Sequence, residues 1–137
     1  MSHSINKNWI HAIWATKDRI PLINGSIERN LYQFISEQFI ELGCQIRIIN
    51  GMPDHIHCLF KLNSQKSIAE VIKQIKGSSS FYMNQNQIIS EKFAWQTGYA
   101  AFSVSESGVK KVYEYIKNQK IHHQKNYFDD EFNAFVQ

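Results

Sequence analysis

The sequence has few of the residues that build fibrous, mucin-like or disulfide-stapled proteins. Its 137 residues include only 6 glycines, 2 prolines and 2 cysteines. This scarcity of glycine and proline excludes collagen-like and mucin-like chains, and no heptad repeat is sustained long enough for a coiled coil. Two cysteines do not form a disulfide framework, so we expect Cys44 and Cys58 to be buried thiols in a reducing compartment.

Long apolar runs are also missing. No stretch approaches the roughly 20 apolar residues that a membrane helix needs, and the first residues lack the basic-then-apolar pattern of a secretion signal. We therefore expect a cytoplasmic protein with no membrane partner. A hydrophobic fraction of 43% is too high for a disordered chain. The length suits one domain that spans residues 1–137.

The net charge of +3 and the sequence pI of about 8.9 permit a nucleic-acid partner but do not establish one. Function therefore has to be inferred from particular residues and their spacing.

The hydrophobic pattern predicts an α+β fold. Strand patterns occur at residues 8–16, 45–51, 55–62 and 99–104. Helical patterns run from a cap at Ser26 to a stop at Gly43, from a capping box at Ser67 to a point before residues 77–79, and from 109 to about 125. This order predicts an antiparallel sheet of four to five strands, ferredoxin-like or RRM-like, with two helices on one face and a C-terminal tyrosine-bearing helix.

The first candidate site is a pair of histidines on the predicted third strand. Side chains alternate across a strand, so His55 and His57 share one face while Ile56 and Cys58 share the other. Two neutral imidazoles side by side can hold a metal ion. The plain alternative is a pair of strand histidines with no function. Because Cys58 faces away from His57, a cysteine–histidine nucleophile pair is disfavoured.

The second candidate site lies on the last predicted helix. Tyr113 belongs to its apolar face, whereas Tyr115 and Gln119 project together from the flank, one helical turn apart. The alternative is a surface tyrosine that covers the helix edge. Together the two sites suggest a chemistry: the histidines and the Gln119 carbonyl can hold a metal, beside which Tyr115 can attack a phosphodiester.

The motifs resemble those of a known family, the HUH (His, hydrophobic residue, His) single-tyrosine transposases of small bacterial insertion sequences, with their REP-associated relatives. The resemblance covers most of the chain and is strongest in Pro-Asp-His-Ile-His followed by Tyr-Ile-Lys-Asn-Gln. The matching stretches are residues 11–17 with Arg19 and Pro21, and residues 52–57, 77–79, 95–96 with 98–99, 102–105 and 115–119.

The resemblance implies that His55, His57 and Gln119 hold Mg²⁺ or Mn²⁺ and that Tyr115 attacks DNA. Attack would give a 5′-phosphotyrosine and a free 3′-hydroxyl, followed by strand rejoining. The resemblance further implies single-stranded DNA substrates with hairpin ends and a homodimer. Whether Tyr115 serves the histidines of its own subunit or those of the partner stays open.

The sequence indicates the DNA-contacting residues less clearly than the catalytic motifs. Arg47, Lys73 and Lys76 are candidates for phosphate contacts, and a solvated basic surface is the alternative for the two lysines.

Three other functions are weighed against the transposase. A non-catalytic or domesticated nucleic-acid-binding protein would not need the histidine pair and Tyr115 together. Relaxases and other HUH nicking enzymes are usually longer, and in relaxases the tyrosine often precedes the histidines. A two-histidine phosphoesterase needs two separate His-x-Thr/Ser motifs, and this chain has neither.

Overall fold

The computed structural model describes residues 4–122. Its strands and main helices, in chain order, are β1 (Trp9–Ala15), α1 (Gly25–Glu41), β2 (Gln45–Met52), β3 (His55–Lys61), α2 (Ile68–Gln85), β4 (Ala100–Val104), α3 (Val109–Lys117) and α4 (Gln119–His122). None of the helices in this part of the chain is long and apolar enough to span a membrane.

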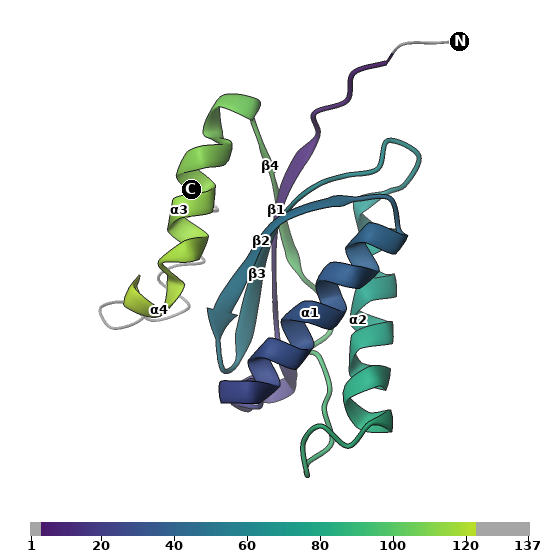
Figure 1. Ribbon diagram of the computed structural model, residues 1–137, viewed down its shortest axis with the longest axis vertical. Coiled ribbons are helices and arrows are strands. Elements are labelled where there is room, and N and C mark those ends of the chain that lie inside the picture. Colours follow the sequence, from purple (N-terminus) through teal and green to yellow (C-terminus); the bar gives the residue numbers. More distant parts are fainter. Residues whose placement is uncertain (1–3, 123–137) are drawn as a thin grey trace.

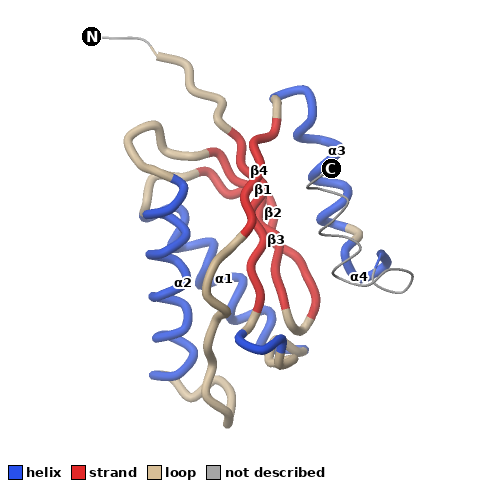
Figure 2. The backbone as a smooth tube through the Cα atoms, turned by 180° about the vertical axis from the view of Figure 1, so that it is seen from behind, coloured by secondary structure: helices blue, strands red, loops and turns tan. Residues whose placement is uncertain are grey.

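The four strands form one antiparallel sheet in the order β2-β3-β1-β4. Strand β3 lies between β1 and β2, and β1 lies between β3 and β4, which is the split βαβ arrangement of a ferredoxin-like fold. Helices α1 and α2 cover one face, and α3 and α4 lie against the other (Figure 1). The view from behind shows the same three layers (Figure 2). The predicted α+β class is confirmed, with four strands in the described residues.

The face beneath α1 and α2 is the main hydrophobic core. It is built from alternate residues of the central strands, which point inward with period two. These residues meet the buried stripes of the two helices. The side chains include Ile10, Ala12 and Trp14 of β1, Ile56, Cys58 and Phe60 of β3, Leu31, Ile35 and Phe39 of α1, and Val71, Ile72 and Ile75 of α2.

The opposite face has a smaller core beneath α3. Trp9, Leu59 and Ile116 are its buried apolar members. His55 and His57 lie on this face of β3 as well, because they alternate along the strand with the residues of the main core. The sheet therefore separates an apolar layer from a layer that mixes apolar and polar groups.

Helix α2 is longer than the sequence pattern predicts. The helix passes through residues 77–79 and ends at Gln85, whereas the sequence pattern predicts an end before Gly77. Tertiary contacts outweigh the low helix propensity of this stretch. Ser79 and Met83 are buried, and the indole Nε1 of Trp95 donates to Ser79 Oγ at 2.9 Å. The capping box of Ser67 and Glu70 is formed as predicted.

Helix α1 begins two residues earlier than predicted, with Asn24 rather than Ser26 at its cap. The Asn24 carbonyl accepts the amide of Ile27 at 2.9 Å, which closes the first turn. At the other end Gly43 has a φ of +74°, the left-handed conformation that favours glycine after a helix.

The last predicted helix is divided at Asn118. α3 ends at Lys117 and α4 begins at Gln119, whereas the pattern predicts one helix from 109 to about 125. Asn50 Nδ2 donates to the carbonyls of Ile116 and Lys117, at 3.0 and 3.1 Å. A side chain from β2 therefore satisfies carbonyls at the end of α3. Residues 123–125 of the predicted helix lie outside the described residues.

The β2–β3 hairpin places the histidine pair and depends on a close backbone approach at Gly51. A Cβ at this position would lie 2.8 Å from Ile56 Cα and closer still to the carbonyl oxygen of His55. Gly77, on the exposed side of α2, is the opposite case, since a Cβ there would meet nothing within 4 Å.

We expect Gly51→Ala to lower the free energy of unfolding by about 1–3 kcal/mol, because the hairpin backbone has to move to admit the methyl group. Gly77→Ala should raise it by about 0.5–1 kcal/mol, because alanine favours a helix interior. Urea denaturation measures both changes. A Gly51→Ala protein as stable as the wild type would contradict the close approach.

Candidate active site

The two predicted histidines lie together on the face covered by α3. His55 and His57 have no exposed surface, and their ring centroids are 5.3 Å apart. Strand alternation puts them on the same face, as the sequence predicts. Each is thus a buried polar side chain that needs hydrogen-bond partners.

Each imidazole has a partner for its Nδ1 atom. His55 Nδ1 lies 2.8 Å from a carboxylate oxygen of Asp54, and His57 Nδ1 lies 2.8 Å from Nε2 of His11. The hydrogen bond to His55 holds the pKa of the Asp54 carboxyl below its usual value, so this carboxylate accepts the proton of Nδ1. The Nε2 atoms of His55 and His57 are buried. Imidazoles that bind metal through one nitrogen commonly have a carboxylate or another acceptor on the other.

Helix α3 brings Tyr115 beside His57 of the same chain. The Tyr115 ring is half-buried, with its centroid 5.9 Å from that of His57 at an interplanar angle of 72°. Gln119, the first residue of α4, is completely buried, including its carbonyl oxygen. Tyr113, two residues from Tyr115, makes a different contact. The guanidinium of Arg47 lies over its ring, 4.6 Å from the centroid, which is a cation–π arrangement.

Asn50 and Lys120 hold this C-terminal segment against the sheet. Asn50 is the register partner of His57 and supplies the donor to the α3 carbonyls. Lys120 Nζ donates to Asn50 Oδ1 at 2.8 Å and to the carbonyl of Gly51 at 2.9 Å, and it pairs with Glu28 at 3.0 Å. These contacts place α4, and with it Gln119, at the same end of β2 as the histidine pair.

Comparison with known proteins places the chain in a family. The profile described as "Transposase IS200 like" matches residues 4–119. The chain belongs to the IS200-like transposase family. The ISDra2 transposase TnpA of Deinococcus radiodurans is 25% identical to it over 114 residues, which cover 80% of this chain and 81% of the relative.

Two solved structures share the fold of this IS200-like transposase. One is a Deinococcus radiodurans R1 protein assigned as a transposase, with a TM-score of 0.66 and 24% identity over 87% of this chain and 96% of that one. The other is a REP-associated tyrosine transposase bound to a REP hairpin, with a TM-score of 0.67 and 14% identity over 90% of this chain and 72% of that one.

The side chains of this transposase fit a divalent cation. Within residues 4–122, His, Cys, Asp and Glu alone do not form a three-ligand cluster, so a metal here needs the Gln119 amide or oxygens from a substrate. Two imidazole nitrogens and one amide oxygen are neutral donors that suit a first-row divalent ion such as Mn²⁺. Three donors are fewer than the roughly six ligands that Mg²⁺ and Mn²⁺ take, so phosphate and water oxygens would complete the coordination.

The three basic residues predicted to contact DNA lie in different surroundings. Arg47 is exposed and borders α3, through its contact with Tyr113. Lys73 and Lys76 are on α2, which covers the opposite face of the sheet (Figure 1). Lys76 Nζ donates to the carbonyls of Gln96 and Gly98 at 2.8 and 2.7 Å, and burial lowers its pKa. Their contact with DNA stays a prediction.

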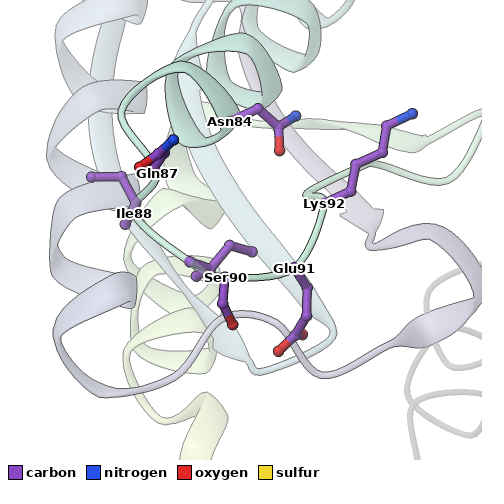
Figure 3. Close-up of a pocket in the computed structure, with 7 residues that line it drawn as sticks. Asn84, Gln87, Ile88, Ser90, Glu91 and Lys92 are labelled. Carbon is purple, nitrogen blue, oxygen red and sulfur yellow. The ribbon is translucent and has the colours of Figure 1, made fainter.

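Two surface hollows in the described part of the chain lie away from the histidine pair. A hollow of about 530 Å³ at the end of α2 is lined by Asn84 and residues 87–92. Figure 3 shows these side chains. A second hollow of about 450 Å³ on α2 is bordered by Lys73. Neither contains a residue of the histidine, tyrosine or glutamine set.

The sequence prediction does not include His11, Asp54 or Asn50 as site residues. Asp54 adjoins His55, so an acidic neighbour is a signal available in the sequence. His11 and His57 are 46 residues apart, and their contact depends on the register between β1 and β3. Alternation alone places each histidine on a face of its own strand and leaves that register undetermined.

We expect Asn50→Ala to lower the free energy of unfolding by about 1–3 kcal/mol, because carbonyls of α3 and the ammonium of Lys120 lose their partner. Amide hydrogen exchange in α3 should accelerate. Asn30→Ala, an exposed change on α1, should stay within about 0.5 kcal/mol of the wild type. Equal stability and exchange in the two variants would show that Asn50 does not dock the helix.

Proposed function

We propose that this chain is a single-stranded DNA transposase whose nucleophile is Tyr115 and whose metal ligands are His55, His57 and Gln119. The metal in this proposal is Mg²⁺ or Mn²⁺. The observation that carries the proposal is the contact between the Tyr115 and His57 rings, whose centroids lie 5.9 Å apart. Family membership supports DNA transposition as the overall activity.

The reaction we propose is a transesterification. A phenol has a pKa near 10, so at pH 7 about one molecule in a thousand is phenolate, a deficit of roughly 4 kcal/mol. When bound, the divalent cation would polarise the phosphoryl group and stabilise the leaving oxygen. Tyr115 Oη forms a bond to phosphorus as the bond to the 3′ oxygen breaks, and the phenolic proton leaves to water or to the DNA. The 3′ oxygen takes up a proton and becomes a free hydroxyl.

The protein's own residues orient this step. Tyr115 is held edge-on against the rings of His57 and His11, at 5.9 and 6.4 Å between centroids. Asn50 and Lys120 fix the helix that carries the phenol. Such positioning lowers the entropic cost of bringing nucleophile and phosphorus together. Rejoining is the reverse attack, in which a 3′-hydroxyl displaces Tyr115 from phosphorus and needs no ATP.

The proposed substrate is single-stranded DNA with hairpin ends. The support is the solved REP-associated tyrosine transposase, which is bound to a REP hairpin and shares this fold. We further propose that the chain works as a homodimer and that Arg47, Lys73 and Lys76 contact phosphates. Within the subunit described here Tyr115 lies beside its own histidines, so the proposal includes attack in cis.

A covalent adduct tests the nucleophile. The protein is incubated with labelled single-stranded DNA that carries a hairpin from the ends of its own element, with Mn²⁺ or Mg²⁺, and the products are run on a denaturing gel. We expect a protein–DNA adduct that Tyr115→Phe and His57→Ala abolish without abolishing DNA binding. Tyr113→Phe is the matched control and should retain the adduct. An adduct that persists in Tyr115→Phe would identify another nucleophile, with Tyr113 the next candidate.

Gln119 is tested through the metal requirement. We expect Gln119→Ala to raise the Mn²⁺ concentration for half-maximal cleavage by about tenfold or more, equivalent to about 1.4 kcal/mol of metal binding. Thermal denaturation of the metal-free protein should show that Gln119→Ala lowers the free energy of unfolding by less than about 1.4 kcal/mol. If instead the variant melts early and keeps a normal Mn²⁺ requirement, Gln119 is a structural residue.

A further inference from the structure

The contact between His11 and His57 has a consequence for the metal site. His11 Nε2 and His57 Nδ1 are 2.8 Å apart, and the two rings stack with centroids 5.1 Å apart and planes 29° from parallel. Both side chains are almost completely buried. A hydrogen bond between two buried imidazoles needs one nitrogen to donate and the other to accept.

The surroundings of His11 hold its ring in place. His11 is the register partner of Phe102 on β4, whose ring centroid lies 6.2 Å away, and the Tyr115 ring lies 6.4 Å away above the sheet. On β3 it is aligned with Leu59, so it reaches His57 diagonally across the strands. Aromatic rings on three elements thus limit the rotamers that His11 can adopt.

The tautomer of His57 decides what its Nε2 atom can do. A neutral imidazole has one protonated nitrogen and one lone pair. If His57 carries its proton on Nδ1 and donates it to His11, the lone pair on Nε2 can bind a cation. If His11 donates instead, His57 carries its proton on Nε2 and cannot bind a metal through that atom. The metal-binding arrangement therefore requires His11 to accept at Nε2 and to carry its own proton on Nδ1.

His55 shows the same arrangement with a different acceptor. Its Nδ1 faces the Asp54 carboxylate at 2.8 Å, and a carboxylate can only accept. Both histidines of the pair therefore have a partner on Nδ1 and a buried Nε2. The two acceptors differ. The Asp54 carboxylate can only accept, so it keeps the proton of His55 on Nδ1, whereas His11 accepts from His57 only when its own proton is on Nδ1.

We propose that His11 is a positioning residue that holds His57 in the tautomer protonated on Nδ1 and in the ring orientation needed for metal binding through Nε2. The inference rests on the proposed function, since it assumes that His57 is a ligand. It adds a residue from β1 to a site otherwise assembled from β3 and the C-terminal helices.

The first test needs no metal and no variant. Imidazole ¹⁵N NMR of the metal-free protein, at a pH well above the usual histidine pKa of about 6.5, reports which nitrogen of His57 is protonated. We expect the proton on Nδ1 in His57 and on Nδ1 in His11. A His57 protonated on Nε2 would overturn the proposal.

The second test compares two substitutions at one position. His11→Gln keeps an acceptor oxygen near the place of Nε2, whereas His11→Leu fills a similar volume without any acceptor. We expect His11→Leu to weaken Mn²⁺ binding, measured with the metal alone by electron paramagnetic resonance, by about 10- to 100-fold. His11→Gln should restore most of the affinity, which a purely structural role for the ring would not predict.

The outcomes separate this inference from the proposed function. If Mn²⁺ binding to the wild type is unaffected by His57→Ala, the metal site itself is wrong. If His57→Ala abolishes binding while a folded His11→Leu protein binds as the wild type does, the site stands and the role of His11 is refuted. Should His11→Leu fail to fold, the NMR result together with Mn²⁺ binding by His11→Gln decides the question. A folded His11→Gln protein that does not bind Mn²⁺ would also count against the role.

Discussion

Asn50 joins two parts of the chain that are far apart in sequence, and the candidate site depends on that junction. Its side chain donates to the last carbonyls of α3 and accepts from Lys120 of α4, while its backbone pairs with His57. One residue thus ends the tyrosine-bearing helix, anchors the segment that follows and lies beside the histidine pair. A nine-residue helix is marginally stable in isolation. It therefore depends both on the packing of Ile116 against Trp9 and Leu59 and on the hydrogen bonds from Asn50.

The two faces of the sheet bury different kinds of side chain. The face beneath α1 and α2 buries only apolar side chains of the central strands, so its stability comes from hydrophobic burial and close packing. The face beneath α3 buries three imidazoles and an amide as well. Burial of such groups is costly unless they are hydrogen-bonded, and the Asp54–His55 and His11–His57 pairs meet part of that need. The same pairs leave the Nε2 atoms of the two β3 histidines in the layer that Tyr115 covers.

Local patterns in the sequence were accurate where local interactions dominate. The capping box at Ser67, the helix stop at Gly43 and the inward and outward faces of β1 and β3 follow from neighbouring residues alone. Two of the errors occur where distant residues intervene. Gly77 does not end α2, because buried contacts continue along the helix through Ser79 and Met83. The last helix breaks at Asn118, where a side chain from β2 takes over its final carbonyls.

Local patterns are enough to predict the fold class and the common face of His55 and His57, because the period of a strand is a property of the local backbone. The predicted common flank of Tyr115 and Gln119 assumes one continuous helix, whereas the structure divides that helix at Asn118. Two features become visible only in the folded chain: the register that brings His11 to His57, and the docking of α3 that brings Tyr115 to His57. These depend on contacts between residues tens of positions apart, which no local period encodes. The sequence therefore identifies the candidate side chains one by one, whereas their arrangement in space results from the packing of α3 and α4 on the sheet.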